Sequence, residues 1–302
     1  MADESLTAGA VARRLGVAVT TLRTWHQRYG LGPSEHLPGH HRRYTSEDLD
    51  RLEVMRRLTA QGVAAAEAAA WARRTPLARP PDVVIVNDGA PAGGGHVIAL
   101  GSATPAARGL ARAAMRLDAV SMRDILEMVL TDRGVIGTWD EVILPVLIGI
   151  GERYEATKRF VEVEHLMSRT VTEVLGALPR PGGDPRVLLA AADEEQHTLP
   201  LEALAAALAE AGVPARFLGA RVPPRALADA ISRTGPVVVV LWSQLPDSGD
   251  IEQLIRIAHL PHPPLMIAAA GPGWPGHLPA AAVRLTALDQ AVETVRAAVG
   301  DM

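Results

Sequence analysis

Residues 193–200, DEEQHTLP, place a carboxylate and an imidazole two positions apart, at Glu195 and His197. They follow the apolar run RVLLAAA and precede the helix-like segment LEALAAALAE. Imidazole is a common metal ligand, and a nearby carboxylate can accept its second ring N–H, which fixes the tautomer and makes the other nitrogen more basic. The spacing therefore suggests a metal ligand, although taken alone it more often belongs to a structural or surface histidine.

The segments around this pair predict the element that positions it. Five apolar runs alternate with helix-like stretches: RVLLAAA, ARFLGA, VVVVLW, LMIAAA and VRLTA. Continuous apolar strands separated by helices are typical of a parallel sheet covered on both faces. We expect a Rossmann-like, flavodoxin-like α/β domain over residues 184–302, with ligands bound at the carboxyl ends of the strands.

Two further segments follow predicted strands of the same domain. Ser243 begins the sequence SQL after the third strand, and GPG at residues 271–273 follows the fourth. We expect Ser243 to hydrogen-bond the Glu195 carboxylate. Gly271 and Gly273 are expected to leave room for a bulky ligand tail.

Taken in order, these segments resemble the cobalamin-binding domain found in methionine synthase, mutases and light-sensing regulators. That domain carries an acidic residue, x, His, x, x, Gly, then Ser-x-Leu, then Gly-Gly. The resemblance implies a bound cobalamin with His197 as the lower cobalt ligand, which suits imidazole chemistry. The residues it assigns to the cofactor are Glu195, His197, Ser243, Leu245, Gly271 and Gly273.

Two prolines depart from that signature. Pro200 stands where the family has Gly, and Pro272 interrupts the glycine pair. We expect Pro200 to begin the next helix, where its missing N–H does no harm. Its ring nevertheless adds bulk where the nucleotide tail of the cofactor would approach the backbone, so a degenerate pocket is the alternative.

Residues 103–180 show helical spacing of apolar side chains and predict a four-helix bundle with breaks at Gly134, Gly137 and Thr157. Tyr154 is followed after nine residues by Glu164 and His165. A Glu-His pair in a helix is usually a surface feature.

The pattern of an aromatic residue followed by Glu-His resembles the light-sensing, cobalamin-dependent branch of the MerR regulators. There, Trp, nine residues and Glu-His cap the adenosyl group on the upper face of the cofactor. The resemblance assigns this role to Tyr154, Glu164 and His165, with His165 as a possible upper cobalt ligand after photolysis. Tyr in place of Trp offers less ring area and adds a hydroxyl, which leaves the identity of the upper ligand open.

The first 76 residues predict a winged helix-turn-helix. Val11, Leu15, Leu22 and Trp25 fall on inner helix faces, and Gly16 separates two short helices. Thr7 is expected to cap the first helix, whereas Ala18 occupies the cap position of the second. HHRRYT, before the amphipathic SEDLDRLEVMRRLTAQG, predicts a basic wing.

This region resembles the DNA-binding domain of the MerR family. The resemblance implies contacts to double-stranded promoter DNA, which would make binding steeply salt-dependent. The alternative for Trp25 and Tyr44 is a role in packing. The arginines outside the set given below can be solvent-exposed side chains that contact no DNA. The expected DNA-contacting residues are Thr20, Arg23, His26, Arg28, Tyr29, His41, Arg42, Arg43 and Tyr44.

The N-terminal part of the chain is basic, whereas the rest of the chain is acidic. Residues 1–74 carry 11 Arg against 8 Asp and Glu, whereas the remaining residues carry 19 basic against 26 acidic side chains. There is no Cys, which excludes disulfides, thiolate metal sites and cysteine nucleophiles. The aliphatic runs are too short to span a membrane. We expect a cytoplasmic protein with no membrane partner and a Pro- and Gly-rich linker over residues 77–102.

Together these features predict a DNA-binding regulator rather than an enzyme. Its resemblance implies a homo-oligomeric repressor, dimer or tetramer, that adenosylcobalamin assembles on DNA and light disassembles by breaking the cobalt–carbon bond. One alternative is a MerR-type regulator with a degenerate cobalamin domain that senses another ligand or a protein partner. Another is a corrinoid-dependent methyltransferase or carrier protein. The operator, the target genes and the sign of regulation do not follow from the sequence.

Overall fold

The computed structural model describes residues 6–34, 43–74, 98 and 103–300. The chain divides into two compact units, one of residues 1–129 and 141–167, the other of residues 130–140 and 168–302. Within the predicted linker, 77–102, only Ile98 is described, and His41 and Arg42 of the predicted wing also lie outside the described residues. The predicted domain boundaries stay predictions.

The N-terminal region of the first unit has the expected helix-turn-helix. It comprises β1 (Leu6–Thr7), α1 (Ala8–Leu15), α2 (Val19–Tyr29), β2 (Arg43–Tyr44), α3 (Ser46–Ala60) and α4 (Ala65–Arg74). The Thr7 hydroxyl accepts the backbone N–H of Ala10 at 3.3 Å, which confirms the predicted cap. Gly16 ends α1 with φ 64°, and Ala18 makes no side-chain cap bond to α2.

Two features hold the start of α3 in place. β1 pairs antiparallel with β2, so that Leu6 faces Tyr44 and Thr7 faces Arg43. Thr45 and Asp48 form a reciprocal capping box at the first turn of α3, which satisfies two backbone N–H groups that the helix leaves unpaired. The pairing of β1 with β2 and the capping box therefore fix the chain on both sides of the start of α3.

Four helices occupy the middle of the chain, as predicted. They are α5 (Pro105–Met115), α6 (Ala119–Thr138), α7 (Leu144–Thr157) and α8 (Val161–Gly176), with the π-helical turn η1 (Trp139–Ile143) between α6 and α7. Gly134 interrupts α6 with φ 68° and ψ −175°, and α7 ends at Thr157, so both predicted breaks are confirmed. The predicted break at Gly137 is wrong, because this residue is helical and the irregular turn begins at Trp139.

Residues Ala119–Thr157 include one helical stretch that is long and apolar enough, by length and composition, to cross a membrane. Nearly half of that stretch is buried within the protein, and core helices of globular proteins pass the same test. The expected absence of a membrane partner stays a prediction.

The second unit contains the predicted parallel sheet. Its strands are β3 (Val187–Ala191), β4 (Ala215–Phe217), β5 (Val238–Trp242), β6 (Met266–Ala270) and β7 (Ala282–Leu285), in the order β4-β3-β5-β6-β7. All neighbours run parallel. This order is that of flavodoxin-like sheets, in which the chain reverses its direction of strand addition between β3 and β5.

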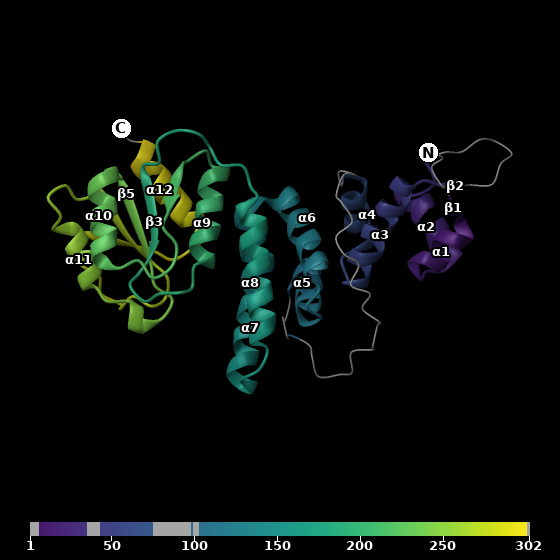
Figure 1. Cartoon of the computed structure of the whole chain (residues 1–302), viewed down its shortest axis with the longest axis horizontal. Helices are drawn as coiled ribbons and strands as arrows, with labels where there is room; N and C mark the ends of the chain where they lie inside the picture. Colours follow the sequence, from purple (N-terminus) through teal and green to yellow (C-terminus); the bar gives the residue numbers. More distant parts are fainter. Residues whose placement is uncertain (1–5, 35–42, 75–97, 99–102, 301–302) are drawn as a thin grey trace. The chain divides into compact units, whose positions relative to one another are not determined.

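Helices cover both faces of this sheet. Figure 1 shows α10 (Pro224–Thr234) and α11 (Glu252–Ala258) on one face, with α9 (Leu199–Glu210) and α12 (Leu288–Gly300) on the other. Leu188, Val239 and Ile267 point to the first face and pack with Leu227 and Leu254. The central strands β3, β5 and β6 are buried on both faces and carry no polar alternation, which explains their continuous apolar sequence. The edge strands β4 and β7 are partly exposed, and each contains an arginine.

Candidate functional site

The predicted metal-ligating segment lies at the reversal point of the sheet. Residues 192–198 follow the carboxyl end of β3, and residues 243–249 follow that of β5. The two strands are paired along their whole length, and the backbone N–H of Ala192 donates to Trp242 O at 2.8 Å. The two loops therefore meet where flavodoxin-like sheets bind ligands.

Glu195 and His197 are in direct contact in this loop. Nδ1 of His197 lies 2.6 Å from Oε1 of Glu195, and the backbone N–H of His197 donates to the same oxygen at 2.8 Å. A carboxylate only accepts, so Nδ1 carries the proton and the lone pair of the neutral ring is on Nε2. The carboxylate is buried, with 1% of its side chain exposed, whereas 48% of the imidazole is exposed. The predicted contact is confirmed.

The environment of Glu195 keeps it ionised. Burial alone would raise its pKa, but hydrogen bonds from Ser248, from the backbone of His197 and Gln244 and from the His197 ring outweigh burial and lower the pKa to about 2. A carboxylate that is ionised at neutral pH holds the neighbouring Nδ1–H more strongly than a neutral acceptor does. This donor set fits a cobalt ion that takes one neutral imidazole as its lower ligand.

The serine that contacts this carboxylate is Ser248, which the sequence analysis missed. Ser248 Oγ donates to Glu195 Oε2 at 2.6 Å, whereas Ser243 Oγ lies 2.8 Å from Ser248 Oγ and 3.0 Å from Leu245 O. The predicted direct bond from Ser243 is therefore wrong. The short 3₁₀ helix η2 (Pro246–Ser248) turns the chain back, so that Ser248 lies between Ser243 and the carboxylate.

The two predicted glycines make room for a neighbouring loop. Gly271 has φ 98°, and a Cβ there would lie 2.2 Å from Ser243 O. A Cβ at Gly273 would lie 2.2 Å from Ser243 Oγ and 2.4 Å from Leu245 O. Both positions need glycine because two loops approach closely. Their expected second role, to leave room for a bulky ligand tail, stays a prediction.

The departures from the family signature have local explanations. Pro200 lies in the first turn of α9, which confirms its expected place at the start of a helix. Pro272 lies between the two glycines, and its side chain is exposed. Leu245, the third residue of the SQL segment, is 51% exposed. Neither proline disrupts the contact between Glu195 and His197.

The three residues predicted to cap the cofactor lie in the first unit. Tyr154, near the end of α7, is 42% exposed, and Lys158 Nζ lies 5.1 Å from the centre of its ring. Glu164 and His165 are exposed in the first turns of α8. All three side chains are thus accessible, and their role towards a cofactor stays a prediction.

The predicted DNA-contacting residues separate into exposed and packed groups. Thr20, Arg23 and Arg28 of α2 are exposed, as is Arg43 of β2. Tyr44 is only 3% exposed, as expected for packing.

Two residues of α2 are partly buried, namely His26 and Tyr29. The ring of His26 lies against Gly32 in the loop after α2. A Cβ added at Gly32 would lie only 1.6 Å from the ring Nδ1, which shows how closely the two residues approach. The exposed arginines are therefore the better placed of the predicted contacts, and each contact stays a prediction.

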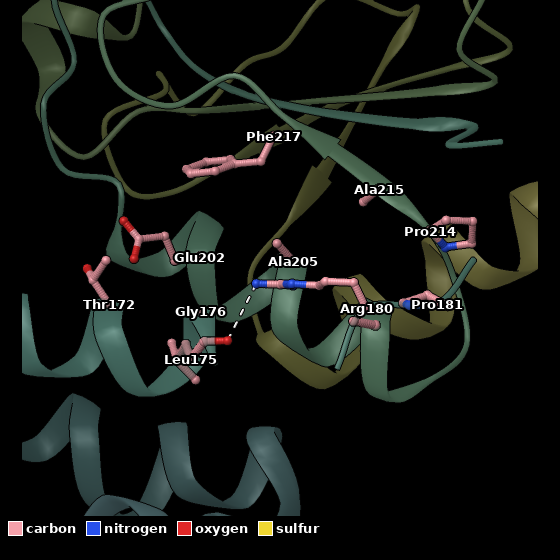
Figure 2. Close-up of a pocket in the computed structure, with 11 residues that line it drawn as sticks. Thr172, Leu175, Gly176, Arg180, Pro181, Glu202, Ala205, Pro214, Ala215 and Phe217 are labelled. Carbon is pink, nitrogen blue, oxygen red and sulfur yellow. Dashed lines mark hydrogen bonds between the residues drawn. The ribbon is translucent and has the colours of Figure 1, made fainter. Parts of the chain in front are cut away.

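A separate cavity of about 360 Å³ lies in the second unit (Figure 2). Leu175 and Gly176 of α8, Ala205 of α9 and Phe217 of β4 contribute to its mostly apolar lining. Arg180 extends across it, with Nη2 3.4 Å from Leu175 O. Its lining includes none of the residues predicted to bind cobalt.

Comparisons with known proteins identify two family domains in this chain and one repressor relative. Residues 6–75 match the family model of MerR HTH family regulatory proteins, and residues 106–178 match that of a B12 binding domain. The HTH-type transcriptional repressor CarH of Myxococcus xanthus is 32% identical over 249 residues, which are 80% of this chain and 79% of that protein.

A solved structure supports the fold of the bundle and sheet. The monomethylamine corrinoid protein of Methanosarcina barkeri superimposes with a TM-score of 0.50 and 12% identity, over 62% of this chain and 94% of its own. At that identity the likeness concerns the fold alone. The repressor relative and the MerR match together favour a regulator over the methyltransferase or carrier alternative. This chain belongs to the CarH family of MerR-type transcriptional repressors and is a cobalamin-binding regulator, not an enzyme.

Proposed function

We propose that this repressor binds adenosylcobalamin with His197 as the lower cobalt ligand, and that light controls its assembly and its binding to promoter DNA. The observation that carries the proposal is the 2.6 Å contact between His197 Nδ1 and Glu195 Oε1 at the reversal point of the sheet. This contact directs the lone pair to Nε2 of a half-exposed ring, which is what a cobalt ligand requires.

When bound, adenosylcobalamin supplies a cobalt–carbon bond that light can break. The protein's part is to hold and shield the cofactor. We assign lower-face binding to Glu195, His197, Ser243, Leu245, Gly271 and Gly273. Upper-face capping is assigned to Tyr154, Glu164 and His165, and the accessible His165 offers a second imidazole.

Control of DNA binding follows from linkage. A cofactor changes assembly only by binding the assembled and dissociated states with different affinity. Each additional subunit on the DNA brings another set of arginine–phosphate contacts, so a modest shift in assembly gives a large change in DNA affinity. We assign the DNA contacts to Thr20, Arg23, His26, Arg28, Tyr29, His41, Arg42 and Arg43, within a DNA-binding domain of residues 1–76, whereas the predicted contact from Tyr44 is replaced by packing because this side chain is buried.

The remaining assignments follow the same proposal. A linker over residues 77–102 joins the DNA-binding domain to a helical bundle of residues 103–180 and to an α/β domain of residues 184–302. The chain functions as a cytoplasmic dimer or tetramer without a membrane partner. A sensor for another ligand is the competing function, and it predicts no cobalamin retention.

Sedimentation of cofactor-loaded protein tests the proposal. Protein purified in the dark with adenosylcobalamin is compared before and after green illumination, with and without promoter DNA. We expect a larger assembly and tight DNA binding in the dark, and a smaller species with weak DNA binding after light. An unchanged mass together with unchanged DNA affinity would contradict light control.

A further inference from the structure

We propose that the cavity formed by the end of α8, by α9 and by β4 is a second ligand site of this protein, which takes a flat aromatic carboxylate. All of its lining residues belong to the second unit, and none of them is predicted to bind cobalt. The proposal rests on the shape of the cavity, on its mostly apolar lining and on the cation that crosses it (Figure 2).

The cavity is formed by residues whose side chains cannot fill it. Its volume of about 360 Å³ lies within the range of small-molecule sites in proteins, about 300–1,000 Å³. More than half of its lining residues are glycine, alanine or proline, which have no side-chain rotamers to close the space. They are Gly176, Pro181, Ala205, Ala209, Pro214 and Ala215. The space is therefore present before a ligand arrives.

Phe217 gives the cavity an aromatic wall. This residue ends β4, an edge strand of the sheet, and 38% of it is exposed. In Figure 2 its ring lies on the opposite side of the cavity from Leu175 and Gly176. Aromatic rings attract each other in offset-stacked arrangements, and a rigid ring loses less freedom on binding than a flexible chain does. The wall therefore favours a flat ligand.

Arg180 supplies a cation with unused hydrogen-bond donors. A guanidinium has five N–H groups, but that of Arg180 makes one hydrogen bond within the described part of the chain, to Leu175 O at 3.4 Å. This bond is longer than the usual range of about 2.7–3.2 Å. The remaining donors can hold a carboxylate through two parallel hydrogen bonds, which is the arrangement that a guanidinium favours.

Glu202 limits the charge of the ligand. It is the one carboxylate among the described lining residues, and the Thr198 hydroxyl donates to its Oε1 at 2.8 Å. A second negative group of the ligand near Glu202 would be repelled. The cavity therefore fits a ligand with a single carboxylate, bound at Arg180, and an uncharged ring system next to Phe217.

The test uses 2-naphthoate, a carboxylate on two fused aromatic rings, in equilibrium dialysis with the full-length protein in the dark. We expect the wild type to bind it and Arg180→Met to bind it roughly 10-fold or more weakly, because a hydrogen bond to a charged group contributes at least about that factor. 2-Naphthamide keeps the rings without the charge and should bind both proteins equally weakly. Octanoate keeps the charge without the rings and should bind the wild type more weakly than 2-naphthoate.

Two further variants serve as comparisons. Arg233→Met removes an exposed guanidinium from α10 of the same unit and should leave the Kd unchanged. Ala205→Leu adds bulk at a wall residue that is 7% exposed, and it should prevent binding. Urea unfolding shows whether each variant is folded. If Ala205→Leu does not fold, Arg180→Met decides, because this side chain is exposed and contributes little to the core.

Equal Kd values for the wild type and Arg180→Met, or no binding to the wild type, would overturn the proposal. Displacement of 2-naphthoate by cobalamin would place the ligand in the cofactor site and would overturn it as well. A second copy of the chain is the competing occupant. It is indicated if 2-naphthoate does not bind, while the cofactor-free wild type self-associates in sedimentation and Ala205→Leu does not. Dialysis of cofactor-free protein needs no cobalamin, so failure of this site is distinguishable from failure of the proposed function.

Discussion

The carboxylate of Glu195 holds His197 at two points, its ring Nδ1 at 2.6 Å and its backbone N–H at 2.8 Å. Both bonds end on the same oxygen, so the side chain and the backbone of the histidine are oriented together. The other oxygen is bonded to the loop after β5. The direction of Nε2 is therefore set by the protein before any metal arrives, which lowers the cost of ordering the ligand on binding.

His197→Ala should abolish lower-face ligation while preserving the fold. The ring is half exposed and contributes one of the five hydrogen bonds that the Glu195 carboxylate accepts, so its loss leaves little buried surface uncovered. Absorbance of protein supplemented with cobalamin should lose the features of a nitrogen-ligated cofactor. A spectrum identical to that of the wild type would remove His197 from the site.

Glu195→Gln should destabilise the apoprotein at neutral pH. A buried amide presents an NH₂ group to donors that need an acceptor, and this leaves polar groups unpaired at a cost of about 1–3 kcal/mol each. Urea unfolding at pH 7 measures the loss. Asp247→Asn, a change from carboxylate to amide in the exposed part of the neighbouring turn, serves as the control and should have little effect.

The stability difference between wild type and Glu195→Gln should depend on pH in one direction. The folded pKa of Glu195 is about 2, below its ordinary value of 4.5, so the ionised form stabilises the native state above pH 4.5. That contribution, about 3 kcal/mol, is lost as the pH falls from 4.5 through 2. Unfolding free energies at pH 6, 4 and 2.5 should converge. A difference that stays constant over this range would contradict the low pKa.

Gly273→Ala should destabilise the loop after β6, whereas Gly276→Ala should not. A Cβ at position 273 would overlap Ser243 Oγ and Leu245 O, and a Cβ at position 276 has no atom within 4 Å. Overpacking of this kind costs about 1–3 kcal/mol. Thermal unfolding of the two variants provides the comparison, and equal midpoints would show that the two loops separate without cost.

Arg23→Ala and Arg43→Ala should weaken DNA binding and reduce its salt dependence. Both residues are exposed in the helix-turn-helix region. Each lost phosphate contact should reduce the slope of log K against log salt concentration by about 0.9. Fluorescence anisotropy with promoter DNA at several salt concentrations measures this slope. Arg233→Ala, on α10 of the sheet domain, is the control, and equal slopes for all three variants would contradict the assigned surface.

The local parts of this structure could be predicted from the sequence because they depend on local physics. The five apolar runs matched the five strands, most clearly at β3, β5 and β6, because strands buried on both faces need no polar alternation. Thr7 caps the start of α1 and Gly16 ends this helix, both as predicted. The contact between Glu195 and His197 could also be predicted, because the two residues lie two positions apart in one short loop.

Tertiary contacts between loops were not accessible in this way. Ser248 reaches Glu195 only because η2 turns the chain back towards the carboxylate. No pattern in the sequence SQLPDSGD indicates that Ser248, and not Ser243, makes this hydrogen bond. The break predicted at Gly137 lies instead at the π-helical turn that begins at Trp139. The helical spacing of apolar residues does not indicate where the backbone hydrogen bonds change from the α-helical to the π-helical pattern.

The central claim is that His197 ligates cobalt in a light-controlled repressor. It is tested most directly by absorbance of adenosylcobalamin-supplemented wild-type and His197→Ala protein, recorded in the dark and after green light. We predict that the wild type retains cobalt, shows a nitrogen-ligated spectrum and changes on illumination, while His197→Ala lacks the nitrogen-ligated form. Absence of retained cobalt in the wild type, or identical spectra for the two proteins, would contradict the account.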